Sequence, residues 1–186
     1  RKQVTKKFLL IASYPGSLLD FRGPFLRALL AEGLEVYVVA PDLPVDCKIR
    51  QQLEALGVQV YEVALNRTGI NLVSDIITVY QLWILMRRIK PDYTLGYTIK
   101  PVIYGSFAAW LARVPKRFAL ITGLGYAFTD YAGGCLRSLV RLVACSLYQR
   151  ALSKVETVFF QNPDDEKTFL QQGITGSSSS TRVVNG

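Results

Sequence analysis

The chain has 186 residues, of which half are hydrophobic and 19% are charged. This length suits one domain with a sizeable core, and the composition is too apolar for a disordered chain. The 22 basic side chains outnumber the 14 acidic ones, which gives a net charge of +8 with no histidine. Such a charge favours polyanions (nucleic acid, anionic lipid headgroups or phosphorylated ligands), unless it is only a solvated basic surface.

One segment approaches the length of a membrane span, but polar residues interrupt it. Leu72–Met86 contains Ser74, Asp75 and Gln81. No stretch reaches the roughly 18 uninterrupted apolar residues that a spanning helix needs. We therefore expect Leu72–Met86 to form a buried amphipathic helix.

The beginning of the chain and its cysteines bear on where the protein works. The chain begins at Arg1 rather than at a methionine, so we expect a piece of a longer protein, and no secretory signal is visible. The cysteines are odd in number and lack metal-ligand spacing, which favours packing roles in a reducing compartment. They are Cys47, Cys135 and Cys145.

Apolar runs and helical patterns alternate along the chain. In chain order, the sequence predicts strand Lys7–Ser13, helix Asp20–Glu32, strand Val36–Ala40, helix Asp46–Leu56, strand Val58–Val63, helix Asn71–Ile89, strand Tyr93–Gly96, helix Pro101–Ala112, strand Arg117–Ile121, helix Leu136–Leu152, strand Val155–Phe160, helix Pro163–Gln172 and strand Arg182–Val184. Gly33 and Gly57 indicate helix ends, and Pro24 and Pro101 indicate helix starts.

The alternation of strands and helices predicts an α/β fold. We expect a parallel sheet of six or seven strands, with helices on both faces and the first strand near the middle. Residues 1–186 are expected to form one domain. In the helix Leu136–Leu152, we expect the apolar positions, Val143 and Leu147 among them, to belong to the core.

Several catalytic motifs are absent. The loop after the first strand, Ser13–Asp20, holds one glycine and fails the G-x-G-x-x-G pattern of dinucleotide folds. The chain has no Walker A loop, zinc-ligand spacing, G-x-S-x-G elbow or histidine. These absences disfavour metal hydrolases, triad hydrolases and ordinary dehydrogenases, and we expect neither a metal nor a cofactor.

Candidate functional residues follow several predicted strands, at the sheet edge where ligands of α/β folds bind. Gly16 and Ser17 precede a helix whose amino end can bind a phosphate, or they form an ordinary turn. Asp20 is a candidate general base or hydroxyl ligand, or else a helix cap. Lys100 is a candidate anion ligand, or else a surface lysine.

Two glycines follow the strand Arg117–Ile121. Gly123 and Gly125 allow a ligand to approach the backbone closely, or they form a structural turn. The segments Tyr97–Gly105 and Ile121–Asp130 both begin where a strand ends and are rich in Gly, Thr and Tyr. Together they predict a small-molecule cleft.

Four segments, in this order, resemble the amino-terminal half of bacterial family-4 glycosyltransferases. They are Asp20-Phe-Arg-Gly-Pro24, Thr98-Ile-Lys-Pro101 with Tyr104-Gly105, Thr122-Gly-Leu-Gly-Tyr-Ala-Phe-Thr129, and Phe160-Gln-Asn-Pro-Asp-Asp165. The resemblance covers nearly the whole chain. Members of that family have the GT-B architecture, in which two Rossmann-like domains face each other across a cleft. They build capsule, O-antigen (a part of lipopolysaccharide) and related glycans.

The resemblance implies that this chain is the acceptor-binding half of such an enzyme. The nucleotide-sugar donor would be held by a carboxy-terminal domain that this chain lacks, so the chain alone is expected to be inactive. Retaining members need no metal, and the resemblance implies no cofactor. Many relatives carry a histidine near Thr122–Gly123, and this chain departs from that pattern.

The implied acceptor is a polyprenyl-diphosphate-linked glycan, and the implied location is the cytoplasmic face of the cytoplasmic membrane. Anionic lipid there attracts a basic, peripherally bound protein. We expect no nucleic-acid partner, because aromatic residues do not interleave with the basic clusters. Two alternatives stay open: a domain of a GT-B sugar-nucleotide epimerase, against which the lack of histidine argues, and a non-enzymatic basic membrane-docking module.

On this hypothesis, the acceptor site is formed by four loops: residues 16–20, 98–100, 122–130 and 161–162. Lys100 pairs with the acceptor diphosphate, and Tyr126 stacks on a sugar face. Asp20, the candidate catalytic residue, orients or deprotonates the acceptor hydroxyl. The other expected substrate contacts are Gly16, Ser17, Thr98, Thr122, Gly123, Gly125 and Asn162.

Overall fold

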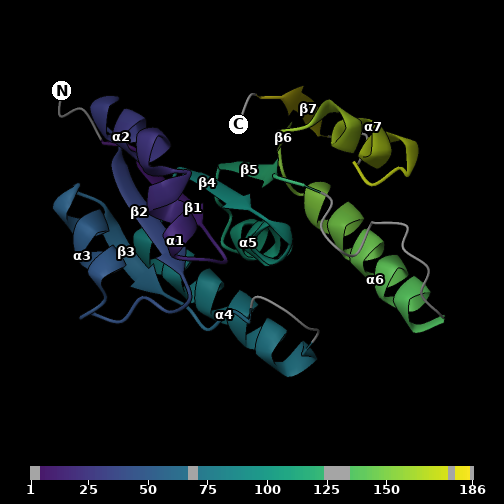
Figure 1. Ribbon diagram of the computed structural model, residues 1–186, viewed down its shortest axis with the longest axis horizontal. Helices are drawn as coiled ribbons and strands as arrows, with labels where there is room; N and C mark the ends of the chain where they lie inside the picture. Colours follow the sequence, from purple (N-terminus) through teal and green to yellow (C-terminus); the bar gives the residue numbers. More distant parts are fainter. Residues whose placement is uncertain (1–4, 67–70, 124–134, 176–178, 185–186) are drawn as a thin grey trace.

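The computed structural model describes residues 5–66, 71–123, 135–175 and 179–184, and for 135–141 it describes the backbone only. In these ranges strands and helices alternate (Figure 1). The elements are β1 Lys7–Ile11, α1 Gly16–Asp20, α2 Gly23–Ala31, β2 Glu35–Ala40, α3 Lys48–Ala55, β3 Gln59–Glu62, α4 Leu72–Ile89, β4 Tyr93–Tyr97, α5 Ile99–Leu111, β5 Lys116–Ile121, α6 Cys135–Leu152, β6 Thr157–Phe160, α7 Pro163–Gln171 and β7 Ser180–Val183.

The strands form one seven-stranded sheet in the order β3-β2-β1-β4-β5-β6-β7. Every neighbouring pair is parallel. The predicted strand number, direction and position of the first strand are therefore confirmed. Since β1 lies between β2 and β4, the chain reverses its order beside β1, and the loops after β1 and β4 lie next to each other.

Helices cover both faces of the sheet, because the side chains of each strand alternate between two buried surfaces. Phe8 and Leu10 of β1 pack with residues of α2 and α3. Leu9 and Ile11 face the other way and pack with residues of α4 and α5. On that second face, residues of α5, α6 and α7 continue the core over β5 and β6. The predicted α/β fold with helices on both faces is confirmed.

The predicted helix Asp20–Glu32 corresponds to α2, but its predicted start is three residues too early, because a separate helix precedes it. A five-residue helix, α1, ends at Asp20, and α2 begins at Gly23. Pro24 explains the break. Its ring would clash with the carbonyl of residue 20 in a continuous helix, and it is tolerated only in a first turn.

Two other helices differ from expectation. Helix α5 begins at Ile99 rather than at Pro101, so Lys100 lies inside its first turn. The expected helix Leu72–Met86 is present as part of α4, which buries Leu82 and Met86, but its other side exposes large apolar side chains and is not buried. In α6, Val143 is 43% exposed and is not a core residue, whereas Leu147 does pack against the core.

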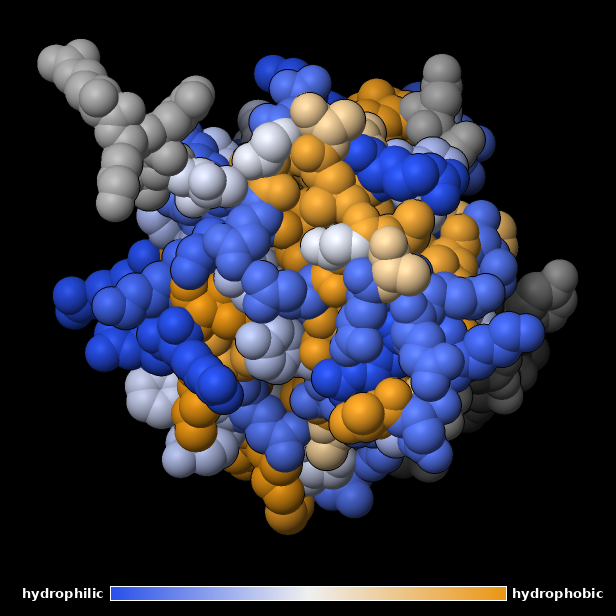
Figure 2. Space-filling model, turned by 90° about the vertical axis from the view of Figure 1, so that its left-hand side faces the viewer, coloured by the Kyte–Doolittle hydropathy of each residue, from blue (hydrophilic) through white to orange (hydrophobic). Residues whose placement is uncertain are grey.

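The surface combines polar and apolar regions. Seen from the side of α3 and the edge strand β3, hydrophilic side chains predominate and surround an apolar area in the upper part of the view (Figure 2). Exposed apolar atoms of this kind are common on folded proteins. Within the described ranges, the helices lack the combination of length and hydropathy that crossing a membrane requires.

Candidate functional site

The loops after β1 and β4 are tied together by hydroxyl groups. The Oγ of Ser13 and the Oγ1 of Thr98 are 2.8 Å apart, and the Oγ of Ser17 lies 2.6 Å from the hydroxyl of Tyr97. Each pair joins residues 80 or more positions apart in sequence. The parallel arrangement of β1 and β4 therefore brings two of the four predicted loops into direct contact.

The backbone of Thr98 is strained. Its φ of 68° and ψ of 169° fall in a region that is almost exclusive to glycine, and threonine is β-branched. Such a conformation costs on the order of 1–3 kcal/mol and occurs most often at functional sites. The hydrogen bond between the hydroxyl groups of Ser13 and Thr98 holds Thr98 in place at the start of α5.

Arg22 lies over the same junction, above the ring of Tyr97. Its guanidinium carbon is 5.0 Å from the centre of the Tyr97 ring. Its Nε is buried and has no hydrogen-bond partner among the described residues. Partial burial lowers the pKa of Arg22, and burial raises the pKa of Tyr97 against the opposing effects of Ser17 and Arg22. An unsatisfied cation at a ligand-binding edge is suited to an anionic ligand.

Lys100, the predicted diphosphate ligand, is already paired. Its Nζ is 3.0 Å from the Oδ1 of Asp75 on α4, and the two side chains are only 12% and 10% exposed. The Lys100 ammonium also lies 5.9 Å from the centre of the Tyr104 ring. Burial and a hydrogen bond to Asp75 raise the pKa of Tyr104. The charge of Lys100 is therefore met inside the protein, where it holds α4 against α5.

Gly16 and Ser17 lie in the one-turn helix α1 rather than before a long helix. The backbone N–H of Ser17 already donates to Tyr14, and that of Leu18 donates to Pro15. Fewer free N–H groups face a ligand here than the sequence suggested. Gly16 has a packing role as well, since a Cβ there would lie 2.7 Å from the Tyr14 ring.

The two remaining polar candidates, Asp20 and Asn162, lie far apart along the sheet edge and have different surroundings. Asp20 is exposed at the end of α1 and caps no helix, so its predicted capping role is wrong, while its catalytic role stays a prediction. The Oδ1 of Asn162 accepts a hydrogen bond from the N–H of Asp164 and caps α7. It follows β6, three strands from β1 and thus roughly 14 Å away at the usual strand spacing.

The loop after β5 lies at the same edge of the sheet. Thr122 and Gly123 are partly exposed, and a Cβ added at Gly123 would meet no atom of the described residues within 4 Å. Among those residues, the space beside this backbone is open, as a ligand-binding role requires. Gly125 and Tyr126 lie outside the described residues.

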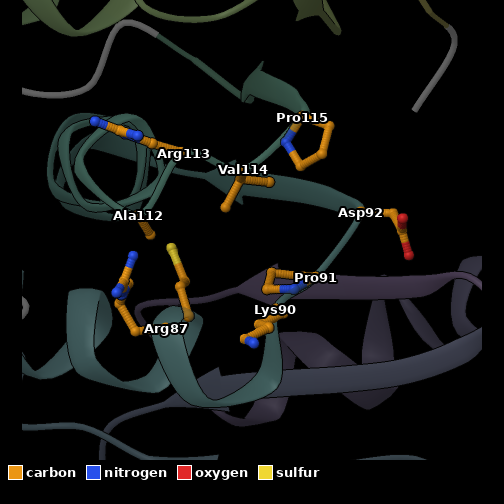
Figure 3. A pocket seen from close by; sticks show the side chains of 9 residues that line it. Arg87, Lys90, Pro91, Asp92, Ala112, Arg113, Val114 and Pro115 are labelled. Carbon is orange, nitrogen blue, oxygen red and sulfur yellow. The ribbon is translucent and has the colours of Figure 1, made fainter.

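A hollow of about 350 Å³ lies at the opposite edge of the sheet, between the ends of α4 and α5 (Figure 3). Arg87 extends toward Ala112 across it, whereas Asp92 points away. Because ligands of parallel α/β sheets bind beyond the carboxyl ends of the strands, we do not assign the substrate site to this amino edge.

Sequence reasoning assigned no role to three residues of the carboxyl edge. They are Arg22, Asp75 and Tyr97. Two signals were available: Arg22 stands directly before the Gly-Pro pair that starts α2, and Asp75 is the one acidic residue of the apolar helix α4. Their partners, 75 and 25 residues further along the chain, could not be read from local sequence.

The fold and its carboxyl edge define a class of protein. The chain belongs to the Glycosyl transferase 4-like family, whose model matches residues 16–162. A relative from Campylobacter jejuni, an N,N'-diacetylbacillosaminyl-diphospho-undecaprenol alpha-1,3-N-acetylgalactosaminyltransferase, is 28% identical over 158 residues. That match covers 85% of this chain and 40% of the relative. The predicted family is confirmed.

Solved structures share the fold at low sequence identity. MurG of Acinetobacter baumannii superposes with a TM-score of 0.60 at 14% identity, covering 97% of this chain and 45% of that one. A UDP-N-acetylglucosamine 2-epimerase gives 0.61 at 16% identity, covering 96% and 48%. The chain therefore spans less than half the length of these proteins. Because transferase and epimerase match equally well, the fold by itself does not choose between them.

Proposed function

We propose that this chain is the acceptor-binding half of a glycosyltransferase. Its acceptor is a glycan linked to a polyprenyl diphosphate. Membership of the Glycosyl transferase 4-like family supports this proposal. The name of the Campylobacter relative, which acts on an undecaprenol-diphosphate-linked sugar, supports the acceptor class.

The observation that carries the proposal is the Nε of Arg22, which is buried and has no hydrogen-bond partner among the described residues. A diphosphate needs several hydrogen-bond donors with positive charge, and a guanidinium offers five donors in one plane. Arg22 lies half-buried beside Tyr97 with its Nε unsatisfied. We assign it the role that the sequence suggested for Lys100, whose ammonium is held by Asp75.

In this reaction the acceptor hydroxyl attacks the anomeric carbon of a nucleotide-sugar. The bond from that carbon to the nucleoside diphosphate breaks, and the hydroxyl proton passes to a base. Asp20 is the candidate that takes this proton or orients the hydroxyl. The donor is held by a second domain beyond this chain, so residues 1–186 alone transfer no sugar at an appreciable rate. We assign no metal or cofactor to the reaction.

The acceptor sets the location. A polyprenyl-linked glycan stays in the cytoplasmic membrane, so the protein works peripherally on its cytoplasmic face. The net charge of +8 supports attachment to anionic lipid there. The glycan product belongs to capsule, lipopolysaccharide or a related polysaccharide.

The test of Arg22 uses the full-length protein with its acceptor and donor. Arg22→Met removes the charge and keeps most of the apolar stem. It should raise the acceptor KM about tenfold or more and change kcat less, because a charge-assisted hydrogen bond contributes about 1.5–3 kcal/mol. Arg27→Met, at an exposed arginine of the same helix, is the control and should leave both constants unchanged. An unchanged acceptor KM in Arg22→Met would contradict the assignment.

Asp20 is tested separately. Asp20→Asn keeps the size and polarity of the side chain but cannot accept a proton, so kcat should fall while the acceptor KM changes little. Glu32→Gln, an exposed acid beyond the end of α2, is the matched control. If Asp20→Asn keeps the wild-type kcat, the base lies elsewhere.

A further inference from the structure

One outer face of α4 is apolar and exposed. Residues spaced four apart form a line along it, and two more lie beside its first half. We call this face the α4 stripe. Its members, with their exposed fractions, are Leu72 (73%), Val73 (69%), Ile76 (68%), Ile77 (44%), Tyr80 (55%) and Ile84 (44%).

The α4 stripe is not the face that holds α4 to the protein. The opposite side of the helix buries Thr78, Leu82 and Met86 against the core and pairs Asp75 with Lys100 of α5. Helix α4 therefore has two apolar sides: one packs against the core, and the other is exposed at the surface. An isolated exposed leucine needs no explanation, but six large apolar side chains on one helix face do.

The position of the stripe links it to the acceptor edge. The most exposed members, Leu72, Val73 and Ile76, flank Asp75, which is bonded to Lys100 at the start of α5. Figure 1 shows α4 along one border of the molecule, with its first turns extending beyond the sheet. A surface that contacted the α4 stripe would lie next to the loop that carries Thr98.

The charges and aromatic groups of α4 match an anionic lipid surface. Arg87, Arg88 and Lys90 are exposed at the end of the helix, whereas its one acid, Asp75, is buried and paired. The Tyr80 and Trp83 rings lie 5.9 Å apart on the same helix, and both residue types favour the membrane–water interface. If a second copy packed here helix to helix, α4 itself would offer these cations no exposed acid.

We propose that the α4 stripe inserts into the interfacial region of an anionic bilayer and holds the acceptor edge against the membrane. This inference rests on the proposed function for its purpose, since a lipid-linked acceptor requires the active edge to reach the lipid surface. The stripe extends roughly 18 Å at 1.5 Å per residue, so it lies along the surface and does not cross it.

The test measures sedimentation of this chain with vesicles of phosphatidylglycerol and phosphatidylcholine. The double variant Leu72→Gln/Ile76→Gln should lower the apparent partition coefficient about tenfold or more, because two largely exposed apolar side chains no longer enter the lipid. The control Val45→Gln/Leu170→Gln changes two residues that are also exposed, 78% and 53%, but lie off the stripe. It should bind as the wild type does.

Charge and insertion are separated by two further measurements. Arg87→Gln/Arg88→Gln should weaken binding to the anionic vesicles and flatten its salt dependence, with little effect on neutral phosphatidylcholine vesicles. In a Trp110→Phe background, Trp83 is the one tryptophan left. Its emission should shift to shorter wavelength on binding and be quenched by brominated lipid.

Three results would overturn the inference. The first is that the stripe variant Leu72→Gln/Ile76→Gln binds vesicles as well as the wild type does. The second is that the stripe variant and the control variant lose vesicle binding to the same extent. The third is a change in solution mass from dimer to monomer in the stripe variant with vesicle binding intact, which would assign the face to a second copy. Sugar transfer by the full-length protein to a water-soluble acceptor tests the proposed function independently, because the stripe variant should keep that activity.

Discussion

Arg22 and Lys100 are basic side chains at the same edge of the sheet, and the protein treats their charges differently. Lys100 lies between α4 and α5, 3.0 Å from the carboxylate of Asp75 and close to the Tyr104 ring. Arg22 lies between α1 and α2 in the chain and over the Tyr97 ring, with its Nε buried and without a hydrogen-bond partner among the described residues. Lys100 therefore contributes to holding two helices together, and Arg22 remains available to a ligand.

The comparison shows why residue type and loop position were insufficient to assign roles. Both cations follow a strand of the same parallel sheet, as sequence reasoning required of a ligand residue. Among the described residues, what separates them is the acidic partner that the tertiary structure supplies to Lys100 and not to Arg22. Four predictions test this contrast, from the largest expected effect to the smallest.

Removing the charge of Lys100 should destabilise the fold most. Lys100→Met leaves Asp75 as a buried, unpaired carboxylate, and breaking a buried pair in this way costs about 3–5 kcal/mol. Urea denaturation, followed by circular dichroism, measures the loss. A loss below about 1 kcal/mol would show that the pair is solvated, and the contrast with Arg22 would fail.

A double-mutant cycle sharpens this prediction. Asp75→Asn should also destabilise the protein, because it leaves the Lys100 ammonium without its counter-ion. The double variant Asp75→Asn/Lys100→Met should lose less stability than the two single variants added together, since neither charge then remains unpaired. Strict additivity would mean that the two side chains do not interact.

The close approach of α5 to β4, which positions Lys100, depends on Gly96 near the end of β4. A Cβ at this position would lie 2.5 Å from the carbonyl oxygen of Pro101, a backbone atom of α5. Gly96→Ala should therefore push α5 away and cost about 1–3 kcal/mol. Gly105→Ala is the control: its Cβ would meet the flexible end of Ile11 at 2.7 Å, so its effect on stability should be smaller.

Arg22→Met should change the free energy of unfolding by less than about 1 kcal/mol. It loses the contact with the Tyr97 ring, which contributes about 0.5–1 kcal/mol, but it also removes a buried donor without a partner. The same denaturation experiment measures it beside Lys100→Met. A loss as large as that of Lys100→Met would assign Arg22 to the scaffold.

The smallest effect is expected at Asp20. This side chain is exposed, ends α1 and caps no helix, so Asp20→Ala should alter stability by less than about 0.5 kcal/mol. Asn162→Ala gives the comparison, because loss of a side-chain cap costs about 0.5–2 kcal/mol. An Asp20→Ala loss in that same range would restore a structural role for Asp20.

Much of the fold could be predicted because its signals are local. Gly33 and Gly57 end helices with φ values of 77° and 92°, as the sequence patterns indicated. The helix expected over Asn71–Ile89 is α4, with Asn71 as its cap. Pro24 correctly indicates a helix start, but the short helix α1 that ends just before it, at Asp20, was not predicted. Of the four loops predicted to converge at the carboxyl edge, those after β1 and β4 are neighbours, since these two strands pair.

The sequence by itself determined the strand and helix alternation, the parallel sheet and the family, because periodicity, glycine and proline positions and short motifs act over a few residues. Tertiary structure alone decided which charges are paired and which apolar face of α4 is exposed. Asp75 meets Lys100 across 25 residues, and Arg22 meets Tyr97 across 75. A helix that is apolar on two sides, such as α4, carries no local signal of which side the core will take, because that choice is made by packing against α5 and the sheet.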